Sequence, residues 1–275
     1  MQIRIGYEIK LNFPRSTPML SLIHSYPNRY HMIQEEKLIV EPFTPYELFI
    51  DGFGNCCTRL LAPAGLFVLK NEAVVEVEGE LDRIDLEAKE CPVLELPYET
   101  LEFLYPSRYC EVDRLENFAW KKFGHIPSGY ERAQAVCYWV YHHIEFGYGH
   151  ARVTKTAYDV LEERKGVCRD FAHLAITLCR SLGMPSRYVT GYLGDIGVPK
   201  DPNPMDFSAW IEVFLSNGWY TFDPRNNKRR IGRIVIAYGR DAADVAITTT
   251  FGSHRLEHFS VYTEEVVDPK NETVV

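Results

Sequence analysis

The sequence predicts an α+β protein in which strands come first, helices follow and strands return at the end. Residues 3–11 alternate between apolar and polar side chains, which is the two-residue period of a half-buried strand. Residues 171–182 instead repeat apolar side chains at helical spacing. Strand patterns resume after Pro185. Strands and helices that are segregated along the chain indicate an α+β fold.

The N-terminal part, residues 1–95, is predicted to be a β-sandwich-like domain. Further short strands are expected at residues 38–40, 66–69 and 73–77, and prolines and Asp51-Gly52 supply the turns between them. No helical pattern interrupts these strands, which favours two packed sheets.

An acidic segment with two prolines, residues 80–97, predicts a linker. We therefore divide the chain into a first domain at residues 1–95 and a core at residues 96–275. In the core, Asp113 is placed to cap a short helix, and Ser128 and Glu131 have the spacing of a capping box.

Two more helices are expected on either side of Gly166. The segment before it, residues 157–165, has apolar residues at helical spacing. The helix after Cys168 carries a longer apolar stripe, and Gly183 and Pro185 end it.

Composition excludes several classes of function. The net charge of −8 over 275 residues predicts neither a nucleic-acid partner nor a membrane surface. The first residues do not resemble a secretory signal, and seven irregularly spaced cysteines indicate reduced thiols in the cytoplasm. No Cys-x-x-Cys occurs and His142-His143 are adjacent, so we expect no metal and no cofactor.

Cys168 is the most informative residue, because it stands where a helix begins. A thiol in the first turn of a helix experiences the positive end of the helix dipole and unpaired backbone N–H groups. Both favour the thiolate, which attacks carbonyl carbon. The alternative interpretation is a buried cysteine that acts as a small apolar side chain.

Asn217-Gly218 predicts a hairpin that leads into Asp223. One register places Trp210 opposite Asp223, with Ser208 on the same face one diagonal step away. A register shifted along the hairpin places Glu212 opposite Asp223 instead. The sequence leaves both registers open.

Three blocks of sequence then resemble one family. They are GVCRDFAHL with LGMPSRYVTGY (residues 166–174 and 182–192), AWIEV (209–213) and GWYTFDP (218–224). Together they resemble the bacterial transglutaminase-like superfamily, whose members are often described as cysteine proteases. The resemblance extends from about Leu101 to Phe222 and beyond. The N-terminal strands resemble the accessory domain of such proteins.

The resemblance implies a papain-like core with helices packed on an antiparallel sheet and a Cys-His-Asp triad. By motif position, Cys168 is the nucleophile and Asp223 is the carboxylate that orients the base. The position of the usual histidine is occupied by Ser208. A serine hydroxyl does not accept a proton usefully near neutral pH, so Ser208 does not replace imidazole as a general base.

Other histidines are considered as substitutes for the missing base. His150, in a glycine-rich loop, and His254, near the C-terminus, are the two candidates. His173 lies about 140° around the helix from Cys168 and is expected to point away. Trp210 is expected to flank the cleft. The basic segment 225–233 is expected to be a solvated loop.

The resemblance therefore implies a cysteine-type amide hydrolase that forms a thioester on Cys168 with a peptide or protein amide. Water would resolve the thioester in a hydrolase, and an amine would resolve it in an acyltransferase. The alternative is a catalytically impaired protein of this fold that serves as a peptide-binding or structural module.

Overall fold

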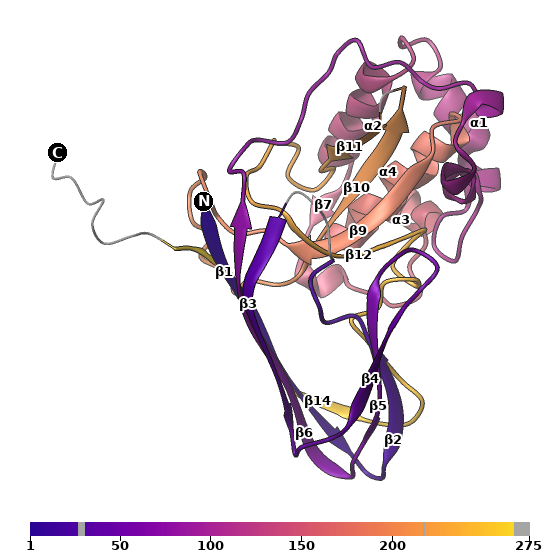
Figure 1. Ribbon diagram of the computed structural model, residues 1–275. Coiled ribbons are helices and arrows are strands. Elements are labelled where there is room, and N and C mark those ends of the chain that lie inside the picture. Colours follow the sequence, from indigo (N-terminus) through magenta and orange to yellow (C-terminus); the bar gives the residue numbers. More distant parts are fainter. Residues whose placement is uncertain (27–30, 217, 267–275) are drawn as a thin grey trace, which may run out of the picture.

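The computed structural model describes residues 1–26, 31–216 and 218–266, without the side chains of residues 31, 32 and 35. It has a strand-rich part and a part in which helices pack on a sheet (Figure 1). The strands are β1 (Gln2–Phe13), β2 (Thr17–Ser21), β3 (His31–Glu41), β4 (Tyr46–Ile50), β5 (Cys56–Ala62), β6 (Gly65–Val77), β7 (Glu145–Phe146), β8 (Lys165–Gly166), β9 (Ser186–Tyr192), β10 (Ser208–Leu215), β11 (Gly218–Phe222), β12 (Ile234–Gly239), β13 (Thr248–Thr250) and β14 (Arg255–Glu265). The helices are α1 (Val112–Phe123), α2 (Tyr130–His143), α3 (Ala157–Glu163) and α4 (Cys168–Ser181), with short 3₁₀ turns η1 (Val93–Glu95), η2 (Tyr98–Leu104) and η3 (Tyr148–His150).

The strand-rich part contains two antiparallel four-stranded sheets, ordered β14-β1-β6-β3 and β13-β2-β5-β4. The predicted alternation in β1 is confirmed, because Ile3, Ile5 and Ile9 are buried while Gln2 and Arg4 are exposed. Buried side chains of both sheets belong to one apolar core, which also includes side chains of the helices and of the sheet around α4.

The C-terminal strands return to this part of the molecule. β14 pairs with β1 and β13 pairs with β2, although the division at residue 95 assigns both to the core. These pairings join segments more than 200 residues apart, and no local pattern in the sequence records such a contact. Where the chain divides into independently folding units stays a prediction.

The α+β core predicted from the sequence is confirmed. Its antiparallel sheet has the order β11-β10-β9-β12, and α4 packs against β9 and β10. Helices α1, α2 and α3 all contact α4, which places α4 in the centre of the core (Figure 1). Every residue of α4 from Asp170 to Ser181 is buried, as expected for a helix enclosed on all sides.

The start of α2 differs from the capping box predicted for Ser128 and Glu131. Gly129 is the N-cap residue, with φ of +106°, and no side chain caps the helix. A Cβ atom at Gly129 would lie 2.2 Å from the carbonyl oxygen of Ala88, and Tyr130 N–H donates to that same oxygen at 3.0 Å. The segment expected as a linker is therefore packed against the helix start.

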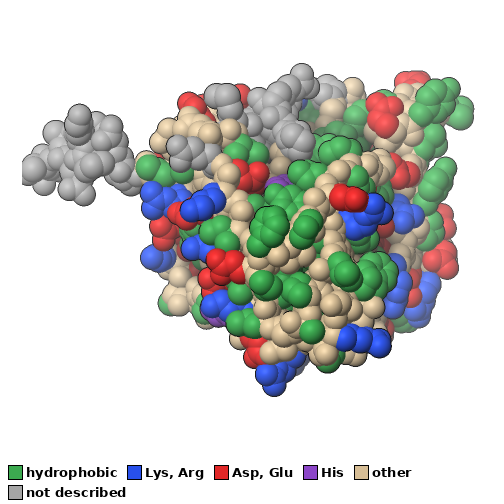
Figure 2. Space-filling view, turned by 60° about the horizontal axis from the view of Figure 1, so that its bottom comes forward, with side chains coloured by type: hydrophobic (Ala, Val, Ile, Leu, Met, Phe, Trp, Pro, Cys, Tyr) green, Lys and Arg blue, Asp and Glu red, His purple; other side chains and the backbone are tan. Residues whose placement is uncertain are grey.

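The surface of the strand-rich part carries exposed apolar side chains. Figure 2 shows hydrophobic groups spread over the middle of this face, with charged groups toward its rim. Among the described residues, Phe43, Leu48 and Ile50 are more than half exposed, at 90%, 53% and 62%. None of the described helices is long and apolar enough to cross a bilayer.

Candidate active site

The N-terminus of α4 places Cys168 at the surface of the core. Val167 is the N-cap residue, and its N–H donates to the Asp170 carboxylate at 2.9 Å. Gly166 precedes it in a short parallel pair with β7, and a Cβ atom there would lie 2.6 Å from that of Asp170. Gly166 thus permits the sharp turn from β8 into α4, at the start of which Cys168 lies.

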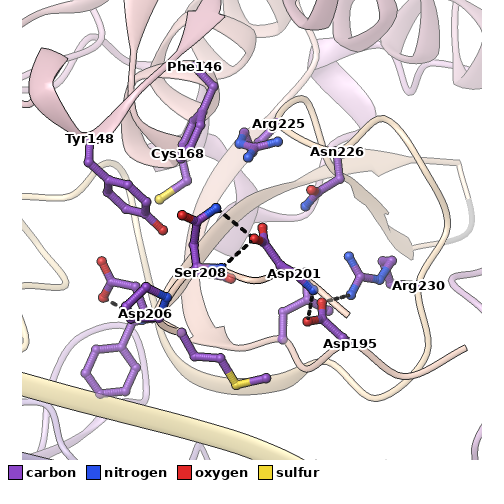
Figure 3. Close-up of a pocket in the computed structure, with 15 residues that line it drawn as sticks. Phe146, Tyr148, Cys168, Asp195, Asp201, Asp206, Ser208, Arg225, Asn226 and Arg230 are labelled. Atoms are coloured by element: carbon purple, nitrogen blue, oxygen red, sulfur yellow. Dashed lines mark hydrogen bonds and ion pairs between the residues drawn. The ribbon is translucent and has the colours of Figure 1, made fainter. Parts of the chain in front are cut away.

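Cys168 lines a cavity of about 110 Å³ (Figure 3). Three other segments complete the wall. The first segment is β7 with η3, which contributes Phe146 and Tyr148. The second is the loop after β11, which contributes Arg225, Asn226 and Arg230. The third is the loop between β9 and β10, which ends at Ser208. The wall therefore joins the helix start and the two strands that the family resemblance assigns to one site.

The Cys168 side chain is half-buried, and burial raises the pKa of its thiol to about 11. The carboxylate of Asp206 acts in the same direction, because a neighbouring negative charge disfavours thiolate. The backbone N–H groups of Arg169 and Ala209 act on the sulfur in the opposite direction. Burial and Asp206 exceed these two donors, so the free protein holds Cys168 as a thiol at neutral pH.

The first of the two hairpin registers is the one observed. Ile211 pairs with Phe222, so the alignment continues to place Trp210 opposite Asp223, just beyond the end of β11. Ser208 begins β10 and lines the cavity. Asn217 lies outside the described residues.

Trp210 differs from the expected cleft residue. It shares a strand face with Ser208, yet it is only 1% exposed and is not part of the cavity wall. The Arg233 guanidinium covers its ring at 5.0 Å, and Gly191 lets the ring approach the neighbouring strand. Trp210 therefore belongs to the core beneath the site.

Asp223 is buried and fully engaged by groups other than a histidine. Its Oδ1 accepts from the N–H groups of Arg225 at 3.1 Å and Asn226 at 2.8 Å. Its Oδ2 accepts from the Asn226 amide at 3.0 Å and from Arg233 at 2.9 Å. Of these partners, Arg225 and Asn226 line the cavity. The carboxylate thus organises the loop after β11.

The basic segment 225–233 differs in part from the solvated loop that the sequence predicts. The Arg233 side chain is buried between Asp223 and Asp82. The Nε of Arg233 donates to the two carboxylate oxygens of Asp82 at 3.0 and 3.1 Å. Arg230 is also buried and pairs with Asp195 at 3.5 Å. Arg230 and Arg233 thus pair with acidic residues of three segments inside the protein, whereas Lys228 and Arg229 are exposed.

The structure places both candidate substitute bases away from the cavity wall. His150 follows Tyr148 in η3, and its Nε2 lies 4.0 Å from Glu145. His254 directly precedes β14 in the strand-rich part, and its Nδ1 lies 2.8 Å from the Thr250 hydroxyl. No histidine of the described residues lines the cavity that contains Cys168.

Comparison with known proteins identifies the family. The profile of the Transglutaminase-like superfamily matches residues 117–224. A crystal structure of a candidate cysteine protease from Cytophaga hutchinsonii superposes with a TM-score of 0.87 at 33% identity, covering 98% of this chain and 92% of that chain. The chain belongs to the transglutaminase-like superfamily. Its core is accordingly a papain-like fold, as the sequence predicts.

Two sequence relatives of this transglutaminase-like protein differ in coverage. Protein ML0607 of Mycobacterium leprae is 30% identical over 215 residues, which are 74% of this chain and 75% of the relative. The human kyphoscoliosis peptidase is 26% identical over 132 residues, which are 46% of this chain and 20% of that protein. The first likeness extends well beyond the core segment, whereas the second is confined to about half of the chain.

Sequence reasoning missed several residues of the transglutaminase-like site. Tyr148, Asp206 and Arg225 line the cavity, and Arg233 and Asp82 hold Asp223 in place. Asp206 lies two positions before Ser208, so its proximity to that residue was a usable signal. The contact between Asp82 and Arg233 spans 151 residues and leaves no local signal.

Proposed function

We propose that this protein is a cysteine-type amide hydrolase that acts on peptide or protein amides through a thioester on Cys168. The observation that supports this most is the setting of the thiol. Cys168 opens α4 in the wall of a cavity, and the N–H groups of Arg169 and Ala209 act on its sulfur. Donors in this position favour negative charge on sulfur, which is the form that attacks a carbonyl.

The reaction begins when the Cys168 thiol loses its proton to water or hydroxide in the cavity. The sulfur then attacks the amide carbonyl carbon, and the C–N bond breaks as the leaving amine takes a proton from water. A second water molecule attacks the thioester, which releases the carboxylic acid and restores the thiol. Ser208 contributes no proton transfer in this scheme, because its hydroxyl is a poor base near neutral pH.

The raised pKa of Cys168 limits the rate at neutral pH. With a thiol pKa of about 11, roughly one thiol in 10⁴ is ionised at pH 7. Ionisation increases with pH, so kcat/KM for amide hydrolysis should rise about tenfold per pH unit between pH 7 and 9. A bell-shaped profile centred near pH 7 would contradict this mechanism.

The test of the proposal is hydrolysis of a library of peptide aminomethylcoumarin amides by the whole protein and by Cys168→Ala. We expect slow turnover that Cys168→Ala abolishes. Cys179→Ala is the matched control, since Cys179 is a buried thiol on the same helix, 11 positions beyond Cys168. Equal turnover by the protein and Cys168→Ala would exclude Cys168 as the nucleophile.

A second candidate function is a catalytically impaired peptide-binding module, and a specific observation favours it. Asp223 is engaged by Arg233 and Asn226, and no histidine of the described residues lines the cavity. The variant Ser208→His separates the candidates. A base at that position should raise hydrolysis by about 10²–10⁴-fold. Hydrolysis by Ser208→His together with none by the natural protein would support the module and exclude the hydrolase.

We also propose that the protein works in the cytoplasm. All seven cysteines are free thiols, which suits a reducing compartment. Fractionation of cells that produce the protein tests this proposal, and recovery in an oxidising compartment would contradict it.

A further inference from the structure

The strand β4 lies at the edge of its sheet, and its core-facing side is exposed. It ends the order β13-β2-β5-β4, so β5 is its one neighbour among the described strands (Figure 1). Tyr46 lies opposite Leu60 of β5, which is buried in the apolar core. Leu48 lies opposite Thr58, which is buried as well. Residues that lie opposite one another share a face of the sheet, so Tyr46 and Leu48 point to the core side, yet both are exposed.

The backbone of β4 also has free hydrogen-bonding groups. Along a strand, the N–H and C=O groups of an antiparallel pair point alternately toward one neighbour and away from it. With β5 on one side, the other side of β4 presents such groups to solvent, and no other described strand pairs with them. A partner that covers β4 therefore supplies both a strand edge and apolar side chains.

β4 lacks the features that usually protect an edge strand from association. Such strands carry unpaired charges, an internal proline or a bulge. Glu47 is the one charged residue of β4, and it pairs with Arg59 on the outer face of the sheet. Pro45 precedes the strand, and the pairing with β5 runs without a bulge. An apolar edge without this protection is suited to pairing with another strand.

A second copy of β4 is complementary to the first. A two-fold axis at Leu48 makes the two strands antiparallel, with Leu48 opposite Leu48 and Tyr46 opposite Ile50 of the other copy. The exposed apolar side chains of both copies then share one face and cover each other. Glu47 lies opposite Phe49 of the other copy, so the two carboxylates do not oppose each other. All five residues of β4 pair in this register.

We propose that two copies of this protein associate through β4, so that their sheets β13-β2-β5-β4 join into one continuous sheet across a two-fold axis. The partner is thus a second copy of the chain, and the interface lies in the strand-rich part. No residue of β4 lines the cavity that contains Cys168. The inference is therefore independent of the proposed amide hydrolysis.

The first test is sedimentation equilibrium of the whole protein over a wide range of concentration. We expect a monomer–dimer equilibrium, and we expect Leu48→Lys to weaken association by about tenfold or more, because it places two positive charges at the centre of the pair. Leu61→Lys is the matched control. Leu61 lies on β5 of the same sheet and is 56% exposed, compared with 53% for Leu48, but it is not at the edge.

The control variant should associate as the natural protein does. Equal weakening by Leu48→Lys and Leu61→Lys, or a natural protein that stays monomeric at every concentration, would overturn the proposal. Dimerisation that appears only after residues 267–275 are removed would also overturn it, since that segment and not a second copy would then occupy the edge.

The second test reads the register and does not depend on weakening the pair. Because Leu48 lies opposite its own copy, Leu48→Cys places two thiols on directly opposite positions, whose Cβ atoms are about 4.5–5.5 Å apart. A short bismaleimide should cross-link Leu48→Cys into a covalent dimer, and it should not cross-link Leu61→Cys or the natural protein. A dimer that Leu61→Cys cross-links and Leu48→Cys does not would place the interface on another face and contradict the proposal.

Discussion

At the scale of single residues, the site is defined by competing effects on one sulfur atom. Burial and Asp206 raise the pKa of Cys168, and the N–H groups of Arg169 and Ala209 lower it. In a triad enzyme an imidazolium would add to the lowering side. Ser208 carries no positive charge and so does not lower the pKa of the thiol in this way. The carboxylate of Asp206 therefore has a large influence on whether the thiol ionises.

Asp206→Asn should therefore lower the pKa of Cys168, because it removes a neighbouring negative charge. The rate of iodoacetamide addition to Cys168, followed by mass spectrometry of its peptide as a function of pH, measures the change. We expect the inflection to move below that of the natural protein, and Asp201→Asn to leave it in place. An inflection that does not move in Asp206→Asn would show that Asp206 has no influence on the sulfur.

The residue scale also shows what the sequence reveals about the site. Cys168 and Ser208 stand in conspicuous local motifs, and both line the cavity. Asp223 stands in a motif as well, but its partner Arg233 could not be predicted from it. Arg233 also pairs with Asp82, which lies 151 residues away, and no local pattern in the sequence records that contact.

At the scale of elements, α4 carries both Cys168 and a fully buried histidine. His173 is fully buried and stacks on Tyr109 with ring centroids 4.9 Å apart. Its Nε2 accepts the N–H of Ala242 at 3.1 Å, so the ring proton lies on Nδ1, which has no partner among the described residues. As the helical spacing predicts, this histidine is not part of the wall that contains Cys168.

Burial lowers the pKa of His173 well below 6.5, and the positive charges of Arg169 and Arg180 act in the same direction. Below pH 6.5 the unfolded chain therefore binds a proton that the folded protein does not bind. The free energy of unfolding should fall with decreasing pH by up to about 1.4 kcal/mol per unit from this residue alone. The loss begins as pH drops through 6.5, and above that value the contribution is constant.

His173→Gln tests this linkage, since the glutamine oxygen can still accept from Ala242. Urea unfolding at pH 7.5, 6.5, 5.5 and 5.0 should give a shallower pH dependence for His173→Gln than for the natural protein. His125→Gln, which changes an exposed ring, is the control. Identical slopes for His173→Gln and the natural protein would disprove the assignment.

At the scale of the whole molecule, the chain crosses between its two parts more than once. β14 returns to β1, and the segment around Asp82 packs against the loop after β11. The periodicity of residues 3–11 is sufficient to predict β1, and the stripe after Cys168 is sufficient to predict α4. Neither pattern specifies β14 as the neighbour of β1, because the pairing depends on contacts between distant segments that a local pattern does not record.

Arg233→Ala should destabilise the whole protein, because it leaves Asp82 and Asp223 without their shared cation. The side chains of the three residues are 7%, 12% and 2% exposed for Arg233, Asp82 and Asp223. Removing one partner of a buried ion pair costs about 3–5 kcal/mol. Urea unfolding measures the loss, and the exposed neighbour Lys228→Ala should change stability by about 0.5 kcal/mol or less. A loss below about 1 kcal/mol in Arg233→Ala would show that this network is not a structural support.

The central claim is that the Cys168 sulfur carries the acyl group during amide hydrolysis. Acid-quenched mass spectrometry of the protein after incubation with peptide aminomethylcoumarin amides measures this directly. The account predicts a mass increase equal to the acyl group, located on the peptide that contains Cys168, reversed by neutral hydroxylamine and absent from Cys168→Ala. Amide hydrolysis that continues in Cys168→Ala, or an acyl group found on another residue, would contradict it.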